Sequence, residues 1–142
     1  MSLFDNRKLS ELKEIGASTV IRIIGYTEIT LGITTILGLG LSFLFAFSGK
    51  PVNVVAFVLI SAAVSIFLGA GLILTKNWSR KLLLFFSGWV ILTKLLIFMD
   101  ILEFKGALIT LMPDYAKNVI SVFYHASIII LLSRETFRKQ FL

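Results

Sequence analysis

Three ionisable residues stand inside apolar stretches of the sequence: Glu28, Lys94 and His125. An ionisable group in hydrocarbon costs on the order of 2.5–3.5 kcal/mol, so such groups are the first places to look for chemistry. At ~1.5 Å per helical residue from the charged ends of their stretches, Glu28 and His125 lie about 12 Å deep and Lys94 near 18 Å. Because a lysine stem is flexible, we expect the three to meet at one level, with Glu28 the anion, Lys94 the cation and His125 a neutral bridge.

This cluster has two interpretations if its members meet, and a third alternative is that they make no contact at all. In the first, Glu28 and Lys94 form an internal ion pair that fixes which helices are neighbours. In the second, Glu28 is a protonatable carboxylate that couples to, or binds, a cation. Lys94 favours the first interpretation, because a permanently neutralised carboxylate is a poor cation site. Asp100 is expected near the outer boundary, in contact with water.

Catalytic and metal-binding patterns are weak. Ser121 and His125 are one helical turn apart, but a nucleophile and its base also need an orienting acid and an oxyanion hole. Ser87 and Lys94 are seven residues apart, about two turns. With no cysteine and one histidine, thiol chemistry, cysteine-ligated metals and multi-histidine sites are excluded. We therefore expect no enzyme activity, no metal and no cofactor.

Composition indicates the solvent in which these residues act. Of the 142 residues, 57% are hydrophobic and 15% charged, and the mean hydropathy is +0.94. A soluble monomer of this size needs more polar residues to cover its surface. The net charge of +6 lies beside apolar runs, which indicates membrane topology and not nucleic-acid binding.

Four apolar runs are long enough to cross about 30 Å of hydrocarbon. They cover residues 20–46, 54–75, 82–102 and 115–132. Short links between them predict an all-α, membrane-embedded up-down four-helix bundle over 20–133. An interfacial segment (1–19) precedes this domain and a basic tail (134–142) follows it. The first run exceeds an upright span, so it is expected to tilt, to project, or to bend at Gly38 and Gly40.

Lysine and arginine set the orientation. Ten of them flank one side and three the other, so both termini are predicted to face the cytoplasm, in a plasma membrane. The ten are Arg7, Lys8, Lys13, Arg22, Lys76, Arg80, Lys81, Arg134, Arg138 and Lys139, and the three are Lys50, Lys105 and Lys117.

Both terminal segments have apolar residues at helical spacing beside charges. Leu9, Leu12 and Ile15 predict a short helix on the membrane surface, and Phe137 and Phe141 a similar contact for the tail. Trp78 and Tyr115 are expected to be interface anchors.

Small residues predict how the helices pack. Gly25 and Gly32 share a face with Glu28 on the first run. The second run offers a small residue at every fourth position, as membrane helix interfaces do: Ser61, Ser65 and Gly69. Asn118, Ser121 and His125 share a face of the fourth run. These are expected to be packing faces within one chain, with self-association a weaker possibility.

The chain resembles small prokaryotic four-span membrane proteins of uncharacterised families. The likeness rests on glycine-rich helices around the basic turn 76–80 and on a last span that runs into the charged tail 133–137. It implies no activity. A second likeness, to small multidrug resistance transporters, rests on Glu28 and the helix count. Those transporters have one essential carboxylate in their first helix, but this chain is longer and carries Lys94.

The sequence therefore predicts an accessory or scaffolding subunit of a membrane assembly. Its partners would be the lipid bilayer and either other membrane subunits or further copies of the chain, with no nucleic acid. The alternative is a proton-coupled exporter that uses Glu28, and a weaker one is an intramembrane hydrolase that uses His125.

Overall fold

The computed structural model describes residues 3–45, 52–99, 101 and 114–141, and this part of the chain is helical, without strands. Its helices are α1 (Leu3–Phe45), α2 (Val52–Ile73), α3 (Asn77–Phe98), α4 (Asp114–Ser133) and the single turn α5 (Glu135–Arg138). The first four are long and apolar enough to cross a membrane, which confirms the predicted helix count. The links predicted around 46–51 and 102–113, with Asp100, Lys50 and Lys105, lie outside the described residues.

Helix α1 is longer than the predicted first span. It continues for 43 residues through the boundary at 19/20 and through Gly38 and Gly40, about 65 Å at the helical rise. The short helix predicted from Leu9, Leu12 and Ile15 is therefore continuous with the first span, and its place on the membrane surface stays a prediction. Charged residues end an apolar run but not a helix, and the residues around the boundary include no proline.

Helices α2 and α3 are joined by a tight turn. The N–H of Lys76 donates to the carbonyl of Gly71 and that of Thr75 to Leu72, each at 2.9 Å. These two bonds make a Schellman motif, in which the residue after the helix is left-handed. Thr75 occupies that position with φ of 52°. Helix α3 then begins at Asn77, five residues before the predicted span. Arg80 and Lys81, which the sequence placed in the link, are part of the helix.

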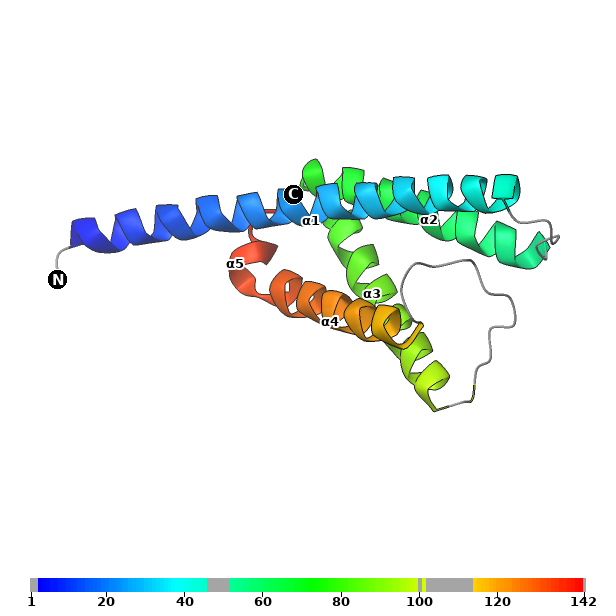
Figure 1. The fold of residues 1–142 in the computed structure, drawn as a ribbon. Coiled ribbons are helices and arrows are strands. Elements are labelled where there is room, and N and C mark those ends of the chain that lie inside the picture. The colour runs from blue at the N-terminus through cyan, green and yellow to red at the C-terminus, as the bar shows by residue number, and fades with distance from the viewer. Residues whose placement is uncertain (1–2, 46–51, 100, 102–113, 142) are drawn as a thin grey trace.

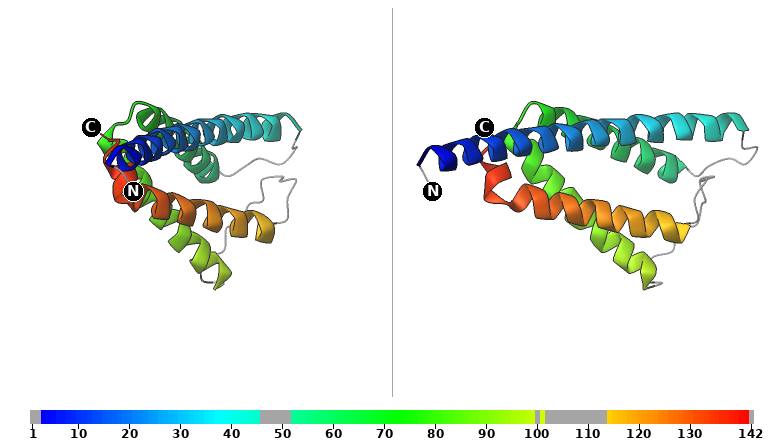
Figure 2. Two further views of the ribbon diagram at one scale, coloured as in Figure 1. Left: turned by 90° about the vertical axis from the view of Figure 1, so that its left-hand side faces the viewer. Right: turned by 60° about the vertical axis from the view of Figure 1, so that its left-hand side comes forward.

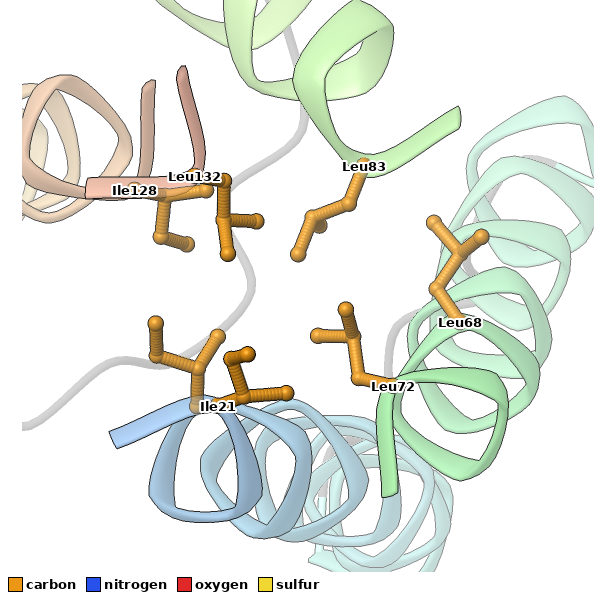
Figure 3. Packing of buried hydrophobic residues seen from close by; sticks show 7 residues of the cluster. Ile21, Leu68, Leu72, Leu83, Ile128 and Leu132 are labelled. Carbon is orange, nitrogen blue, oxygen red and sulfur yellow. The ribbon is translucent and has the colours of Figure 1, made fainter. Parts of the chain in front are cut away.

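The long helices form two hairpins that meet at one end. α1 lies along α2, α3 lies along α4, and the hairpins diverge away from their contact (Figures 1 and 2). The core lies where they meet (Figure 3), and it consists of Ile21, Ile24, Leu68, Leu72, Leu83, Ile128 and Leu132. The prediction of a bundle therefore needs a correction: the four helices share a core at one end only.

The tail closes the core end. α5 packs against α1 and α4, and Phe137 and Phe141 pack against the core cluster. These two side chains thus face the protein, where the sequence had predicted a contact with the membrane surface. The difference arises because α1 lies beside α5. The apolar face of a short helix packs on an apolar surface, and here that surface is the core of the protein itself.

Candidate functional site

The site is built on a close crossing of α1 and α2. A Cβ atom added to Gly69 would lie 2.5 Å from the carbonyl oxygen of Gly25, and one added to Gly32 would lie 2.7 Å from the carbonyl oxygen of Ala62. Such distances leave no room for a side chain. Gly25, Gly32 and Gly69 therefore lie in the contact between the helices, as small residues do where membrane helices approach closely.

Ser61 does not share this contact. Its side chain is exposed, and Ala62, 3% exposed, occupies the crossing. The physical reason is the helical period. Residues 62 and 69 differ by about 20° around the helix, whereas 61 and 69 differ by about 80°. A strict spacing of four thus leaves the face after two steps, and Ser61 is a correction to the predicted packing set.

Glu28 lies at the centre of the crossing and is 4% exposed. The Tyr124 hydroxyl of α4 donates to its Oε1 at 2.8 Å, and the Ser65 hydroxyl of α2 contacts its Oε2. Glu28 thus joins three helices through hydroxyl groups. Ser65 also lies 3.0 Å from the main-chain oxygen of Glu28.

The Ser65 hydroxyl faces two oxygens of Glu28, one on the side chain and one on the main chain. A serine has one hydroxyl proton to share between them. These contacts tie Glu28 to α2 at the crossing.

Lys94 and His125 are held between α3 and α4. Lys94 Nζ donates to Asn118 Oδ1 at 2.8 Å, and His125 Nδ1 lies 3.2 Å from Ser87 Oγ. These hydrogen bonds do not join the three predicted residues directly, and they give no support to a Glu28–Lys94 ion pair. The depth count had assumed parallel helices, whereas α3 diverges from α1 along its length (Figure 1).

Tyr124 is the link between the two polar groups. Its hydroxyl reaches Glu28, while its ring packs edge-to-face against that of His125 at 5.2 Å between centroids. Sequence reasoning missed this residue. The signal was available, since Tyr124 adjoins His125 and lies three residues after Ser121, but an aromatic residue in a membrane helix is more often plain packing.

The α3–α4 contact repeats every seven residues. Arg80 Nη1 donates to the Leu132 carbonyl at 3.3 Å. The pairs Ser87–His125 and Lys94–Asn118 follow, each a further seven residues along both helices. Seven residues are nearly two full turns, so one polar face of each helix meets the other throughout. From the sequence, Lys94 was expected to meet Glu28 and His125, and neither its partner Asn118 nor the Ser87–His125 contact was predicted.

The α2–α3 turn has its own contact. Ser79 is fully buried and its hydroxyl donates to the Leu68 carbonyl at 2.5 Å. A Cβ atom added to Gly71 would lie 2.6 Å from that of Ser79, so the glycine allows the two helices to approach. Sequence reasoning had not singled out Ser79.

The two predicted anchors differ in their surroundings. Trp78 is 39% exposed and stacks on Phe67 with 4.7 Å between ring centroids. Tyr115 is 71% exposed and contacts the ring of Phe98 edge-to-face at 5.7 Å. Both lie near helix ends with part of the ring free, which suits a membrane interface.

The Ser87 hydroxyl, 3.2 Å from His125 Nδ1, is fully buried and so offers a substrate no access. Among the residues that the structure describes, no group of three histidine, cysteine, aspartate or glutamate side chains could hold a metal ion. Two hollows on the described surface lie on α1 and beside α5, and neither is lined by Glu28.

Comparison with known proteins adds no relative: no family model, curated protein or solved structure matches this chain.

Proposed function

We propose that the chain is a multi-pass protein of a plasma membrane, with both termini in the cytoplasm. Four helices long and apolar enough to span a bilayer support this placement. The charges support the orientation, because cytoplasmic loops carry the excess of lysine and arginine. Exposed Arg22, Lys76, Lys81 and Arg134 all lie at the end where the helices meet.

The function we propose is that of an accessory or scaffolding subunit of a membrane assembly. The supporting observation is the small covered area of the α3–α4 hairpin. Within the chain, only 11% of the residues in the apolar segment of each of these two helices are buried. Large side chains such as Trp89 and Phe123 are more than half exposed. Helices in lipid associate by close packing, and this hairpin offers most of its surface to another subunit or a second copy.

Cysteine crosslinking in native membranes tests this proposal, because the chain has no cysteine of its own. Trp89→Cys and Phe123→Cys place a thiol on exposed positions of α3 and α4. Leu37→Cys, 61% exposed on α1, is the matched control. The proposal expects a discrete adduct from α3 and α4 and none from the control. If all three variants stay monomeric, or all crosslink diffusely, the subunit role is wrong.

A second candidate, a proton-coupled exporter, is favoured by the surroundings of Glu28. Its carboxyl group is buried within the chain and is contacted by hydroxyl groups from two other helices. A membrane carboxyl group that can gain and lose a proton is the part such an exporter needs.

Proteoliposomes separate the two candidates. An exporter moves charge or protons when a cationic or small hydrophobic substrate is added, and Glu28→Gln abolishes the signal while the protein stays folded. A subunit gives no substrate-induced signal in either form. Movement that survives Glu28→Gln would exclude the role of this carboxyl group.

A further inference from the structure

Cations of α1, α3 and α5, and of the residues that follow α2 and α4, gather at the end where the hairpins meet. Ile21, Leu72, Leu83 and Leu132 pack together there (Figure 3). Residues close to these four in the chain therefore surround the same contact. They include five exposed cations, termed here the basic collar: Arg22, Lys76, Lys81, Arg134 and Arg138.

Specific contacts hold the parts of the collar together. Arg80 of the α2–α3 turn donates to the Leu132 carbonyl at 3.3 Å, which fixes the turn against the end of α4. Its guanidinium carbon also lies 5.8 Å from the centre of the Phe141 ring. Phe137 packs on the core from within α5. The segment 76–81 carries Lys76 and Lys81, and the tail carries Arg134 and Arg138. These contacts hold the two segments together at the end where the hairpins meet.

The collar has little acidic compensation in the described part of the chain. The nearby exposed acid, Glu135, pairs with Lys139 at 3.3 Å, and Lys139 is outside the collar. Glu28 is buried among hydroxyls. Glu14, also exposed, precedes Arg22 by eight residues along α1, about 12 Å. Five like charges at one level favour an anionic partner.

Apolar side chains adjoin these cations. Ile23, Leu74 and Leu82 are 57%, 64% and 41% exposed, and each lies within two residues of a collar cation. Trp78 lies between Lys76 and Lys81 with its ring partly free. Cations suit the headgroup region of a bilayer, tryptophan suits the interface below it, and exposed aliphatic side chains suit the upper acyl region.

We propose that the basic collar binds the phosphate groups of anionic phospholipids. The inference rests on the membrane placement proposed above. Each cation would meet a headgroup phosphate while its apolar neighbour contacts the acyl chain, and a free phosphate ion could use only the first contact.

Lipid titration of the full chain in mild detergent, followed by native mass spectrometry, tests the proposal. Phosphatidylglycerol should remain bound, and phosphatidylcholine should bind at least about tenfold more weakly, because the choline cation cancels the charge of its phosphate. Equal retention of the two lipids overturns the proposal. Inorganic phosphate that displaces phosphatidylglycerol at similar concentrations also overturns it, since the ligand would then be the free ion.

Paired variants distinguish lipid binding at the collar from a general effect of net charge. Arg22→Gln with Lys81→Gln removes two collar cations, and Lys8→Gln with Lys13→Gln removes two exposed cations elsewhere on α1. About 1 kcal/mol per basic residue corresponds to about fivefold in affinity, so the collar variant should lose about 25-fold and the control less than about threefold. Equal losses would contradict the collar.

Two further measurements distinguish a loss of lipid binding from a loss of folding and from a wrong membrane placement. Thermal stability without added lipid shows whether each variant folds. Lys76→Gln with Arg138→Gln carries the same expectation if the first collar variant does not fold. A chain that stays folded in water without detergent contradicts the membrane placement itself. A chain that inserts into vesicles but binds both lipids alike contradicts the collar alone.

Discussion

Glu28 shows how hydroxyl groups from neighbouring helices can accommodate a buried carboxyl group. Tyr124 and Ser65 supply hydroxyls from two other helices, and the glycines of the crossing bring Ser65 close enough to do so. The sequence predicted a packing face on each of the two helices, because small residues at helical spacing allow close approach. It did not predict that these faces meet or that Ser65 and Tyr124 contact Glu28, because local spacing does not report contacts between helices.

Removal of the Tyr124 hydroxyl should destabilise the protein. In Tyr124→Phe one oxygen of Glu28 loses its donor, and an unsatisfied buried polar group costs about 1–3 kcal/mol. Tyr26→Phe, at a position 60% exposed on α1, should change little. Thermal unfolding in detergent measures both. The effect of Tyr124→Phe should shrink in a Glu28→Gln background, and an unchanged effect there would contradict the contact.

Enlarging a glycine at the crossing should separate α1 from α2. A Cβ in Gly69→Ala would meet the Gly25 main-chain oxygen at 2.5 Å, and backbone cannot move aside as a side chain can. Overpacking of this kind costs about 1–3 kcal/mol. Gly88→Ala on α3, with nothing within 4 Å, should be neutral or slightly stabilising. A lower melting temperature for Gly88→Ala than for Gly69→Ala would refute the crossing.

At the scale of elements, the helices follow from the apolar runs, but their ends do not. The turn between α2 and α3 ends one helix through backbone bonds to Gly71 and Leu72, with Thr75 in the left-handed position. A glycine at position 75 would have indicated this helix end in the sequence. Threonine, a β-branched residue that rarely takes the left-handed conformation, gives no such signal.

Thr75→Gly should therefore stabilise the protein. A left-handed L-residue costs about 1–2 kcal/mol, and glycine avoids the cost at the expense of some chain entropy. Thr93→Gly, inside α3 with its hydroxyl bonded to the Trp89 carbonyl, should destabilise it. The two variants are compared by thermal unfolding. Loss of stability in both would show that the left-handed turn is absent.

For the whole molecule, the number of helices followed from the sequence, but their arrangement did not. Short links require neighbours to be antiparallel, and the hairpins agree. The divergence of the α3–α4 hairpin from the α1–α2 hairpin depends on contacts concentrated at one end, those of the core cluster. Those contacts are between residues far apart in the chain, which local patterns do not report.

Spin-label distances should detect this divergence in lipid. Labels at Ile23 and Leu82, both exposed near the core end, should be closer together than labels at Leu37 and Leu95, which lie nearer the C-terminal ends of α1 and α3. The two helices diverge in that direction (Figure 1). The cysteine-free chain allows each pair to be introduced alone. Equal distances would indicate parallel packing of the four helices, as first predicted from the links.

Fractionation of cells that express the full chain tests membrane embedding most directly. After lysis and an alkaline carbonate wash, the protein should remain with the membrane pellet and dissolve only in detergent, because its four apolar helices leave most of their surface uncovered. Recovery of folded, monodisperse protein in the supernatant without detergent would contradict the account, together with every role assigned to Glu28, to the α3–α4 surface and to the collar.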